Sequence, residues 1–454
     1  MWKSKVFWGT LLFSVLLLAG CGGQEAQPTP TRSEVEPPRV TVVPTPTPRL
    51  TIIYATPTPT PAGETPPPAP TPTPTWTPAP PTEAPTPTFT PTPASVISPV
   101  PVPVTPVSTP TSALVPPANP PGALVPSTPV PLPPRPENIN PLTGLPVSDP
   151  SVLRRRPIHA RIGNDPVIRP QEGLNAADVI YEELIDSLVD PRDPNRINSF
   201  MTRITAVYLG QDPPRVWPIR SARLVSIALA REYHAALVHS GASDGIRYRL
   251  AQSRQAGEDF IDLDELFHPS IFNTHREFDW RGSKSVDVRK VRQYLRAQGW
   301  EKDVRPRGFY FTESPPPGGQ PASEIYIPYP ACCNVTWRYN PQTGLYERYV
   351  RGQPHLDRAD NQIIAVSNVI VHFARHENTD MVEDSLGSRG IRIYLDGEGE
   401  AWIFRDGRMY RARWRHGDRF QMTEYLTLDG QPFPLKPGRT WVQFVPLTYD
   451  VKVR

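Results

Sequence analysis

Proline most constrains what the first part of this chain can fold into. Of the 63 prolines in the 454-residue sequence, 38 fall between positions 28 and 136, in stretches such as "PTPTPT". Proline fixes the backbone φ angle and has no amide hydrogen to donate, so neither a helix nor a sheet can propagate through such a run. Residues 21–136 are therefore predicted to be a disordered linker, with the folded part beginning at Glu137.

A linker of this composition favours the polyproline II conformation. At about 3.1 Å per residue, roughly 110 residues extend to on the order of 300 Å when fully stretched. We interpret the segment as a spacer. Its Ser and Thr hydroxyls are either unmodified or carriers of O-linked sugars, and the composition leaves both alternatives open.

The segment before the linker has the layout of an export signal. Two lysines precede an almost wholly apolar run over residues 6–20, which ends in "LAGC" at Cys21. About 15 apolar residues make a helix of roughly 22 Å, short of the ~30 Å core of a bilayer. "LAGC" resembles the lipobox of bacterial lipoproteins, so residues 1–20 are predicted to be a lipoprotein signal peptide and Cys21 the lipidation site. An ordinary secretory signal is the alternative.

The nearly balanced charge of the folded part limits which partners it is expected to bind. From Glu137 onward, 42 Lys and Arg residues stand against 40 Asp and Glu residues, with both signs interspersed. Nucleic-acid binding needs a concentrated basic stripe, so nucleic acid is not expected as the main partner. No pattern indicates a cofactor or a metal site.

The first half of the folded part reads as alternating strands and helices. Short β-branched or apolar runs that end in Gly, Asp or Asn predict strands, and runs with apolar residues at helical spacing predict helices. Ser221 and Ser285 are the expected N-caps of two of these helices. The predicted strands are 157–163, 179–184, 203–210 and 234–241, and the predicted helices 221–233, 245–252 and 285–299.

The second half changes character after the proline- and glycine-rich stretch 313–323, which suits a domain boundary. Alternating apolar runs follow one another with almost no helical pattern, and "DG" at Asp406-Gly407 and again at Asp429-Gly430 indicates tight turns. We therefore predict an α+β protein. A layered α/β domain with a mixed sheet covers residues 137–316, and a largely antiparallel β domain covers 317–454.

Six sequence blocks, taken in order, resemble the YerB-like bacterial lipoproteins. The resemblance covers essentially all of residues 140–454. It implies an extracytoplasmic lipoprotein with a mixed α/β first part and a β-rich second part, and it brings no assigned catalytic residues. The blocks are "NPLTGLPV" (140–147), "RPQEGLNAADVIYEEL" (169–184), "PIRSARL" (218–224), "ALVHSGAS" (236–243), "NVIVHF" (368–373) and "GRTWVQFVP" (438–446).

Arginines at the start of a predicted helix form the first candidate site. Arg220, Ser221 and Arg223 open the helix after a predicted strand, where free amide donors and the helix dipole favour an anion. Arg203, at the start of another strand, joins these candidates for binding a carboxylate or phosphate. In the alternative interpretation, Ser221 is a simple cap and both helix arginines pair with Glu182, Glu183 or Asp186.

The stretch "HSGASDG" is the second candidate. Its G-x-S-x-G pattern at Ser243 fits a nucleophile elbow, but it also fits a ligand-binding loop at the end of a strand or a plain tight turn. His239 and Ser240 are expected near the same cleft. Were the protein an enzyme, Ser243 or the acidic group Glu182 and Glu183 would be the catalytic candidates.

Three further sequence features are weaker candidates for a functional site. The adjacent Cys332 and Cys333 form either a vicinal disulfide or, as we favour from sequence, two packed thiols. His372 and His376 lie too far apart in an extended chain to share a metal. Four tryptophans of the second half are either core residues or sugar platforms: Trp337, Trp402, Trp414 and Trp441.

The sequence as a whole predicts a protein held by lipid at the outer face of the cytoplasmic membrane, in the cell envelope. Its two-domain head is expected to bind an envelope component, a cell-wall or other anionic polymer, or a small solute, without catalysis. An envelope hydrolase acting on cell-wall or carbohydrate substrate is the alternative. A scaffold that docks another membrane protein is a third possibility.

Overall fold

The computed structural model describes residues 128–330 and 332–454. The predicted signal peptide, Cys21 and most of the predicted linker lie outside the described residues. The described end of the linker contacts the folded part, since the Val130 N–H donates a hydrogen bond to the Glu424 carboxylate at 2.8 Å. Within the described part of the chain, no helix combines the length and the apolar character needed to cross a membrane.

The first half alternates strands and helices, and every strand and helix predicted there overlaps an observed one. Short 3-10 helices connect several of these elements. The strands and α-helices are β1 (Ile158–Gly163), β2 (Val179–Ser187), β3 (Ser199–Tyr208), α1 (Leu224–Glu232), β4 (Ala236–His239), α2 (Asp244–Gln255), β5 (Ile261–Asp264), β6 (Phe272–Thr274), β7 (Lys284–Val286) and α3 (Val288–Ala297). The 3-10 helices are η1 (Pro150–Arg154), η2 (Pro166–Ile168), η3 (Leu174–Ala176), η4 (Pro269–Ile271) and η5 (Trp280–Gly282).

Two predicted helix caps are wrong. Ser221 lies ahead of the true N-cap of α1, Arg223, whose N–H donates to the Ser226 hydroxyl at 2.9 Å. Ser285 lies within β7, and Asp287 caps α3 by accepting a hydrogen bond from the Arg289 N–H. A carboxylate two residues nearer the helix supplies the acceptor that Ser285 was expected to provide.

The second half contains strands and no α-helix among its described residues. The Asp406-Gly407 hairpin is confirmed, with positive φ angles of 53° and 68° at the turn between β17 and β18. The strands are β8 (Gln320–Pro321), β9 (Glu324–Ile327), β10 (Val335–Asn340), β11 (Leu345–Val350), β12 (Gln353–Pro354), β13 (Ala365–Val366), β14 (Asn368–Ala374), β15 (His376–Val382), β16 (Arg389–Ile393), β17 (Gly397–Arg405), β18 (Arg408–His416), β19 (Glu424–Leu426), β20 (Thr440–Pro446) and β21 (Lys452–Val453).

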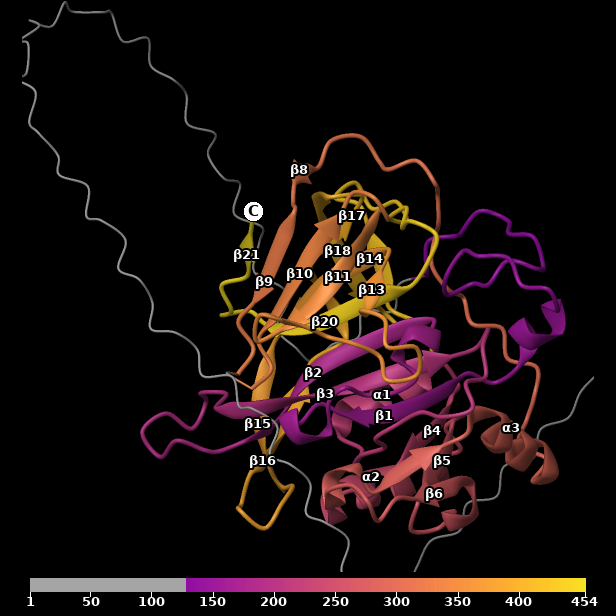
Figure 1. Ribbon diagram of the computed structural model, residues 1–454, viewed down its shortest axis with the longest axis vertical. Helices are drawn as coiled ribbons and strands as arrows, with labels where there is room; N and C mark the ends of the chain where they lie inside the picture. The colour runs from indigo at the N-terminus through magenta and orange to yellow at the C-terminus, as the bar shows by residue number, and fades with distance from the viewer. Residues whose placement is uncertain (1–127, 331) are drawn as a thin grey trace, which may run out of the picture. The chain divides into compact units, whose positions relative to one another are not determined.

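A large sheet of 13 strands runs through both halves, with the main order β19-β18-β17-β14-β20-β2-β3-β1-β4-β5. Figure 1 shows the helices gathered at the β1, β4 and β5 end of this sheet. β20, from the end of the sequence, pairs in parallel with both β14 and β2. The protein is thus α+β and rich in strands, with mixed and antiparallel sheets. The predicted domain boundary between residues 316 and 317 stays a prediction. The large sheet contains strands from both sides of that boundary.

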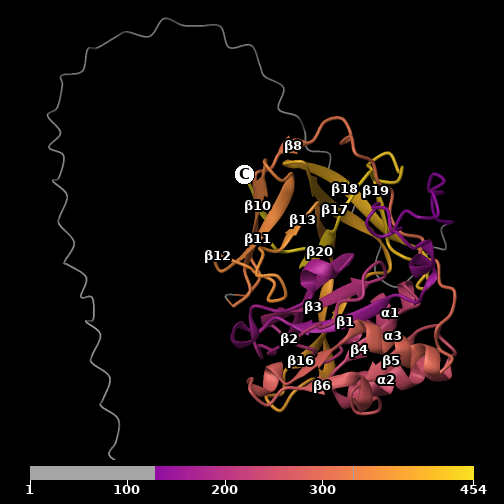
Figure 2. The ribbon, with the colours of Figure 1, turned by 45° about the vertical axis from the view of Figure 1, so that its right-hand side comes forward.

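A smaller sheet of six strands, with the order β12-β11-β10-β9-β21 and β13 beside β11, is wholly antiparallel. It packs against the large sheet, where the rings of Trp337 and Trp441 lie 5.3 Å apart. Figure 2 shows the small sheet on the side of β20 away from the helices. Buried apolar residues of the two halves form one hydrophobic core.

Side chains alternate across β2 and separate two polar regions. Tyr181 faces α1, where its hydroxyl lies 2.7 Å from that of Tyr233. Glu182 faces the small sheet and accepts a hydrogen bond from Arg348 in β11 at 2.9 Å. The candidate residues therefore divide between the helix side and the small-sheet side of the large sheet.

Candidate functional site

The candidate ligand residues meet at the carboxyl ends of three parallel strands, β1, β4 and β5. The segment that leads into α1 lies beside the end of β1, because the Arg220 N–H donates to the Arg161 carbonyl at 2.7 Å. The loop after β4 lies beside the same segment, with the Ser240 N–H donating to the Arg220 carbonyl and the Ala222 N–H donating to the Gly241 carbonyl. Loops at this edge of an α/β sheet commonly supply binding groups.

Arg203, in β3, is the most buried member of the arginine cluster formed by Arg203, Arg220 and Arg223. It is only 4% exposed, and its Nη1 donates to the Ser221 carbonyl at 3.1 Å. Its Nε is buried without a hydrogen-bond partner among the described residues. Burial lowers the pKa of Arg203, and the charges of Arg223 and Arg220 lower it further. Asp186 opposes this lowering but forms no ion pair with Arg203 among the described residues. Because arginine keeps its proton in proteins, this is a buried positive charge without a directly paired carboxylate.

The other two arginines of the cluster differ in their partners. Arg223 donates from Nε and Nη2 to the two oxygens of Asp186 at 2.6 and 2.7 Å, and its Nε lies 3.5 Å from Glu383. The guanidinium of Arg220 makes no hydrogen bond or ion pair to the described residues and stacks on Trp280, 4.7 Å from the ring centroid. Pairing with an acidic residue of β2, the predicted alternative for both arginines, therefore holds for Arg223 alone.

A covering arm from the second half, made of β15, β16 and residues 383–388, reaches this region. Its Met381 packs against α2, since a Cβ placed on Gly245 would lie 2.9 Å from the Met381 sulfur. Burial raises the pKa of its Glu383, while Arg223 opposes that rise. The three arginines of the cluster thus face Asp186 and Glu383, while the nearby Glu183 and Asp165 are paired with Arg161 and Arg281. The excess of positive charge favours an anion.

The histidine and serines of "HSGASDG" hold the loop in place. Ser243 is the N-cap of α2, and its hydroxyl accepts a hydrogen bond from the Ile246 N–H at 3.4 Å. Ser240 donates to Glu265. The two ring nitrogens of buried His239 contact Asp262 and the Gly241 carbonyl. Among the described residues, no imidazole is hydrogen-bonded to Ser243. The Ser243 side chain instead contacts the carboxylate of Glu383, and this hydrogen bond acts to lower the pKa of Glu383.

Glu182 and Glu183 do not form a catalytic carboxylate pair, because they lie on opposite faces of β2. Glu183 pairs with Arg161 at 2.6 Å, and both side chains are completely buried. Glu182 accepts hydrogen bonds from Asn164, Thr202 and Arg348 on the other face. Each carboxylate is thus engaged in an interior hydrogen-bond network, and a catalytic role for either stays a prediction that this burial does not support.

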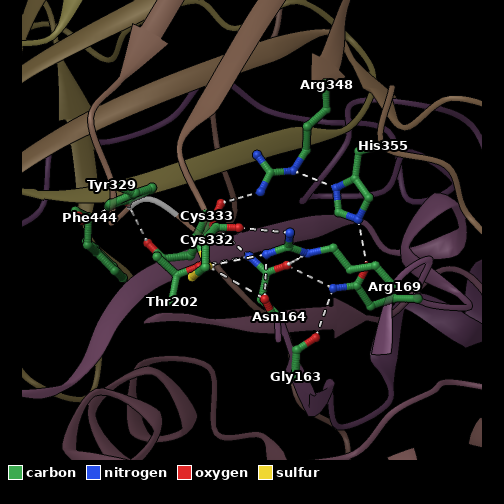
Figure 3. A network of polar contacts seen from close by, with 12 residues as sticks. Gly163, Asn164, Arg169, Thr202, Tyr329, Cys332, Cys333, Arg348, His355 and Phe444 are labelled. Atoms are coloured by element: carbon green, nitrogen blue, oxygen red, sulfur yellow. Dashed lines mark hydrogen bonds and ion pairs between the residues drawn. A yellow bond between two sulfur atoms is a disulfide. The ribbon is translucent and has the colours of Figure 1, made fainter. Parts of the chain in front are cut away.

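That network joins the two halves of the fold on the small-sheet side (Figure 3). Arg348 donates to His355 at 2.9 Å, and His355 contacts Gln171 at 2.6 Å. Arg169 donates to the side chain and the carbonyl of Asn164 and to the Cys332 carbonyl. These contacts connect the end of β1 and the segment after it to the small sheet, so we interpret the network as structural.

Cys332 and Cys333 are joined by a disulfide, so the expectation of two packed thiols is wrong. The pair lies beside Arg169, whose Nη2 is 3.3 Å from the Cys333 sulfur (Figure 3). The sequence left this outcome open, because residue spacing alone does not decide whether two neighbouring thiols oxidise.

His372 lies within β14, whereas His376 is the first residue of β15. His372 is completely buried and stacks on Trp414 at 4.4 Å between ring centroids. The Nδ1 of His376 contacts the Ala374 carbonyl. Among the described residues, no group of three or more His, Cys, Asp or Glu side chains is arranged to hold a metal ion.

Among the described residues, the one tryptophan that is largely exposed is not one of the four considered from sequence. Trp337, Trp414 and Trp441 are buried in the core and Trp402 is partly buried against it. Trp280, in contrast, is 69% exposed beside Arg220. Its setting in the polar stretch "EFDWRGS" is a signal that sequence reasoning missed, because a large apolar residue among charged ones indicates a surface position.

A cleft of about 400 Å³ lies elsewhere, lined by Glu172, Asp212, Asp357 and Asp360 among others. Asp357 there accepts hydrogen bonds from the Gly173 and Asn175 N–H groups. This carboxylate therefore fixes a loop of the second half to the first. The cleft also holds Arg215, whose buried Nε lies 3.3 Å from the Glu172 carboxylate, so its charge is paired as that of Arg203 is not.

Comparisons with known proteins confirm the family resemblance. Two family models match, described as "Protein of unknown function (DUF3048)" N-terminal domain over residues 142–300 and C-terminal domain over residues 325–442. The chain is 27% identical over 321 residues to "Putative lipoprotein YerB" of Bacillus subtilis (strain 168), which covers 67% of this chain and 86% of that protein. The crystal structure of the YerB protein from Bacillus subtilis matches with a TM-score of 0.56 and 23% identity, over 69% of this chain and 98% of that one. This structural likeness concerns the fold alone.

Proposed function

The chain belongs to the DUF3048 family and carries its N-terminal and C-terminal domains in order, and from this premise we propose that it is a lipid-anchored envelope protein whose folded part binds an anionic group without catalysis. The name of its Bacillus subtilis relative supports the lipid anchor. The "LAGC" stretch supports Cys21 as the attachment point. On this proposal the proline-rich linker holds the folded part away from the outer face of the cytoplasmic membrane.

The observation that carries the binding proposal is the buried guanidinium of Arg203. A charge removed from water costs free energy unless a counter-charge meets it, and here Arg223 and Arg220 act on Arg203 more strongly than the carboxylate of Asp186 does. A bound carboxylate or phosphate supplies the missing counter-charge and accepts hydrogen bonds from the guanidinium. The half-exposed Arg220, Ser221 and Ser243 form the rim of the site.

We propose binding without catalysis because Ser243 is engaged as a helix cap. Ser243 is the nucleophile that an envelope hydrolase would use. His239, the nearest histidine in sequence, is engaged with Asp262 and a backbone carbonyl. The contact between Ser243 and the Glu383 carboxylate is the one observation among the described residues that suits the hydrolase alternative, and it lacks the histidine of a Ser–His pair.

Titration calorimetry with acetate and with inorganic phosphate, at fixed ionic strength, tests anion binding by the full chain in detergent. We expect saturable binding that Arg203→Gln weakens at least tenfold, equivalent to about 1.4 kcal/mol. Arg296→Gln removes one positive charge from an exposed position of α3 and is the matched control, expected to bind like the wild type. Absence of saturable binding, or equal affinity of the Arg203→Gln variant, would contradict the proposal.

The anchor has a separate test. We expect the wild-type chain to label with a radioactive fatty acid and to sediment with membranes, and Cys21→Ala to lose both properties. Since Cys332 and Cys333 are paired with each other, label retained by Cys21→Ala would count against lipidation at Cys21.

A further inference from the structure

An exposed aromatic side chain adjoins the arginine cluster. Trp280 is 69% exposed, yet the 3-10 helix that carries it is held firmly. The neighbouring Arg281 donates to Asp279 and to Asp165 at 2.7 and 3.0 Å, and the Gly282 carbonyl accepts a hydrogen bond from Trp217 at 2.6 Å. The indole is therefore presented to solvent on an anchored loop, which lowers the ordering cost of binding to it.

Arg220 links Trp280 to the arginine cluster. Its guanidinium stacks on the indole, while its carbonyl accepts a hydrogen bond from the Ser240 N–H in the candidate site. The absence of a side chain on Gly163 leaves room for Arg220, because a Cβ there would lie 2.7 Å from the Arg220 Cγ. The aromatic surface and the buried charge of Arg203 thus belong to one continuous region.

These two features select a chemical class of ligand. A pyranose ring presents an apolar face of C–H groups that packs on an indole, and a carboxylate matches the planar fork of a guanidinium. A singly charged carboxylate also suits the region better than a doubly charged phosphate, because Asp186 and Glu383 lie within it and repel additional negative charge.

Resting on the proposed anion binding, we propose that the ligand is an acidic glycan, whose sugar ring packs on Trp280 and whose carboxylate pairs with Arg220 and Arg203. The Trp280 surface sets the preference for a sugar, and the arginine cluster sets the preference for its charge. Both features together distinguish an acidic glycan from a free anion and from a neutral glycan.

Calorimetry with the full chain in detergent separates these contributions. The probes are oligogalacturonate, a neutral galactose oligomer of equal length, and acetate, all at the same ionic strength. We expect oligogalacturonate to bind at least tenfold more tightly than either other probe. Trp280→Ala is expected to weaken oligogalacturonate binding at least tenfold and acetate binding less than threefold, whereas Arg203→Gln weakens both.

Tyr326→Ala, in β9 of the small sheet, is the control for loss of a surface aromatic and is expected to match the wild type. If acetate binds but oligogalacturonate gains nothing, or if Trp280→Ala leaves its affinity unchanged, the glycan inference is overturned while anion binding stands. If no probe binds saturably, the proposed function fails as well.

Discussion

Two arginines on neighbouring strands of the large sheet define what is unusual about the site at the scale of single residues. Arg161 in β1 and Arg203 in β3 are both buried, at 0% and 4% exposure. Arg161 pairs with Glu183, which is equally buried, so its charge is compensated within the protein. Arg203 has no such partner among the described residues. A buried arginine therefore stabilises the fold at position 161 and lowers its stability at position 203.

Replacing each arginine by Met separates these roles. Arg161→Met leaves Glu183 as an unpaired buried charge and is expected to lower the free energy of unfolding by about 3–5 kcal/mol. Arg203→Met removes an uncompensated charge and is expected to leave stability unchanged or raise it, as is common when a binding residue is lost. Urea unfolding without added anions measures both. Equal destabilisation by the two substitutions would mean that Arg203 has a structural counter-charge.

His416 gives the protein a predictable response to alkaline pH. Burial lowers its pKa, but Glu232 and Asp396 outweigh that effect and raise its pKa from 6.5 to about 9. The folded state thus binds the proton more tightly than the unfolded state does. The resulting stabilisation is complete below pH 6.5 and is lost as the pH rises through about 9, by up to about 3 kcal/mol.

Unfolding free energies measured from pH 6.5 to pH 10 test this response. In the wild type we expect stability to fall across the alkaline part of this range. His416→Asn removes the titrating group and is expected to flatten that part of the profile. Parallel profiles for the two proteins would show that another group is responsible.

Two tight turns between strands show how backbone conformation and side-chain packing both determine which residue a turn accepts. The turns at Asp406-Gly407 and Arg351-Gly352 each have positive φ at both residues, a conformation that glycine adopts without steric cost. They differ in their surroundings. A Cβ on Gly407 would lie 2.8 Å from the Tyr339 ring, whereas a Cβ on Gly352 would meet nothing within 4 Å.

Alanine at each glycine separates backbone strain from packing. Gly352→Ala is expected to cost about 1–2 kcal/mol through the left-handed backbone alone. Gly407→Ala is expected to cost more, because the Tyr339 ring must also move. Thermal unfolding of both variants provides the comparison, and equal losses would argue that the Tyr339 contact relaxes freely.

Local patterns in the sequence predict most elements, because each strand or helix is encoded by the spacing of its own residues. They do not predict that β20 pairs in parallel with β2, since that contact joins segments about 260 positions apart. The same limit applies to the site. Arg220 and Ser243 were recognised from local motifs, but the missing partner of Arg203 depends on every neighbouring strand. Trp280 was within reach of sequence reasoning, because its polar surroundings indicate exposure.

The insertion of β20 between β14 and β2 makes the large sheet a property of the whole folded part. Separating the chain at the predicted boundary leaves the β2 edge that β20 covers without its hydrogen-bonding partner. We therefore expect residues 137–316, expressed alone, to lack a cooperative unfolding transition, and residues 137–454 to show one. A sharp transition in the shorter fragment, followed by circular dichroism, would instead support two independent domains.

An anion located at the arginine cluster in a crystal would show that the cluster binds one. Cacodylate carries a single negative charge at pH 7.5, and its arsenic can be located by anomalous scattering in a crystal of the protein. The account predicts an arsenic peak with an oxygen in hydrogen-bonding distance of Arg203 Nε and close to Arg220. Peaks only elsewhere, or an Arg203 side chain already paired with a protein carboxylate, would contradict it.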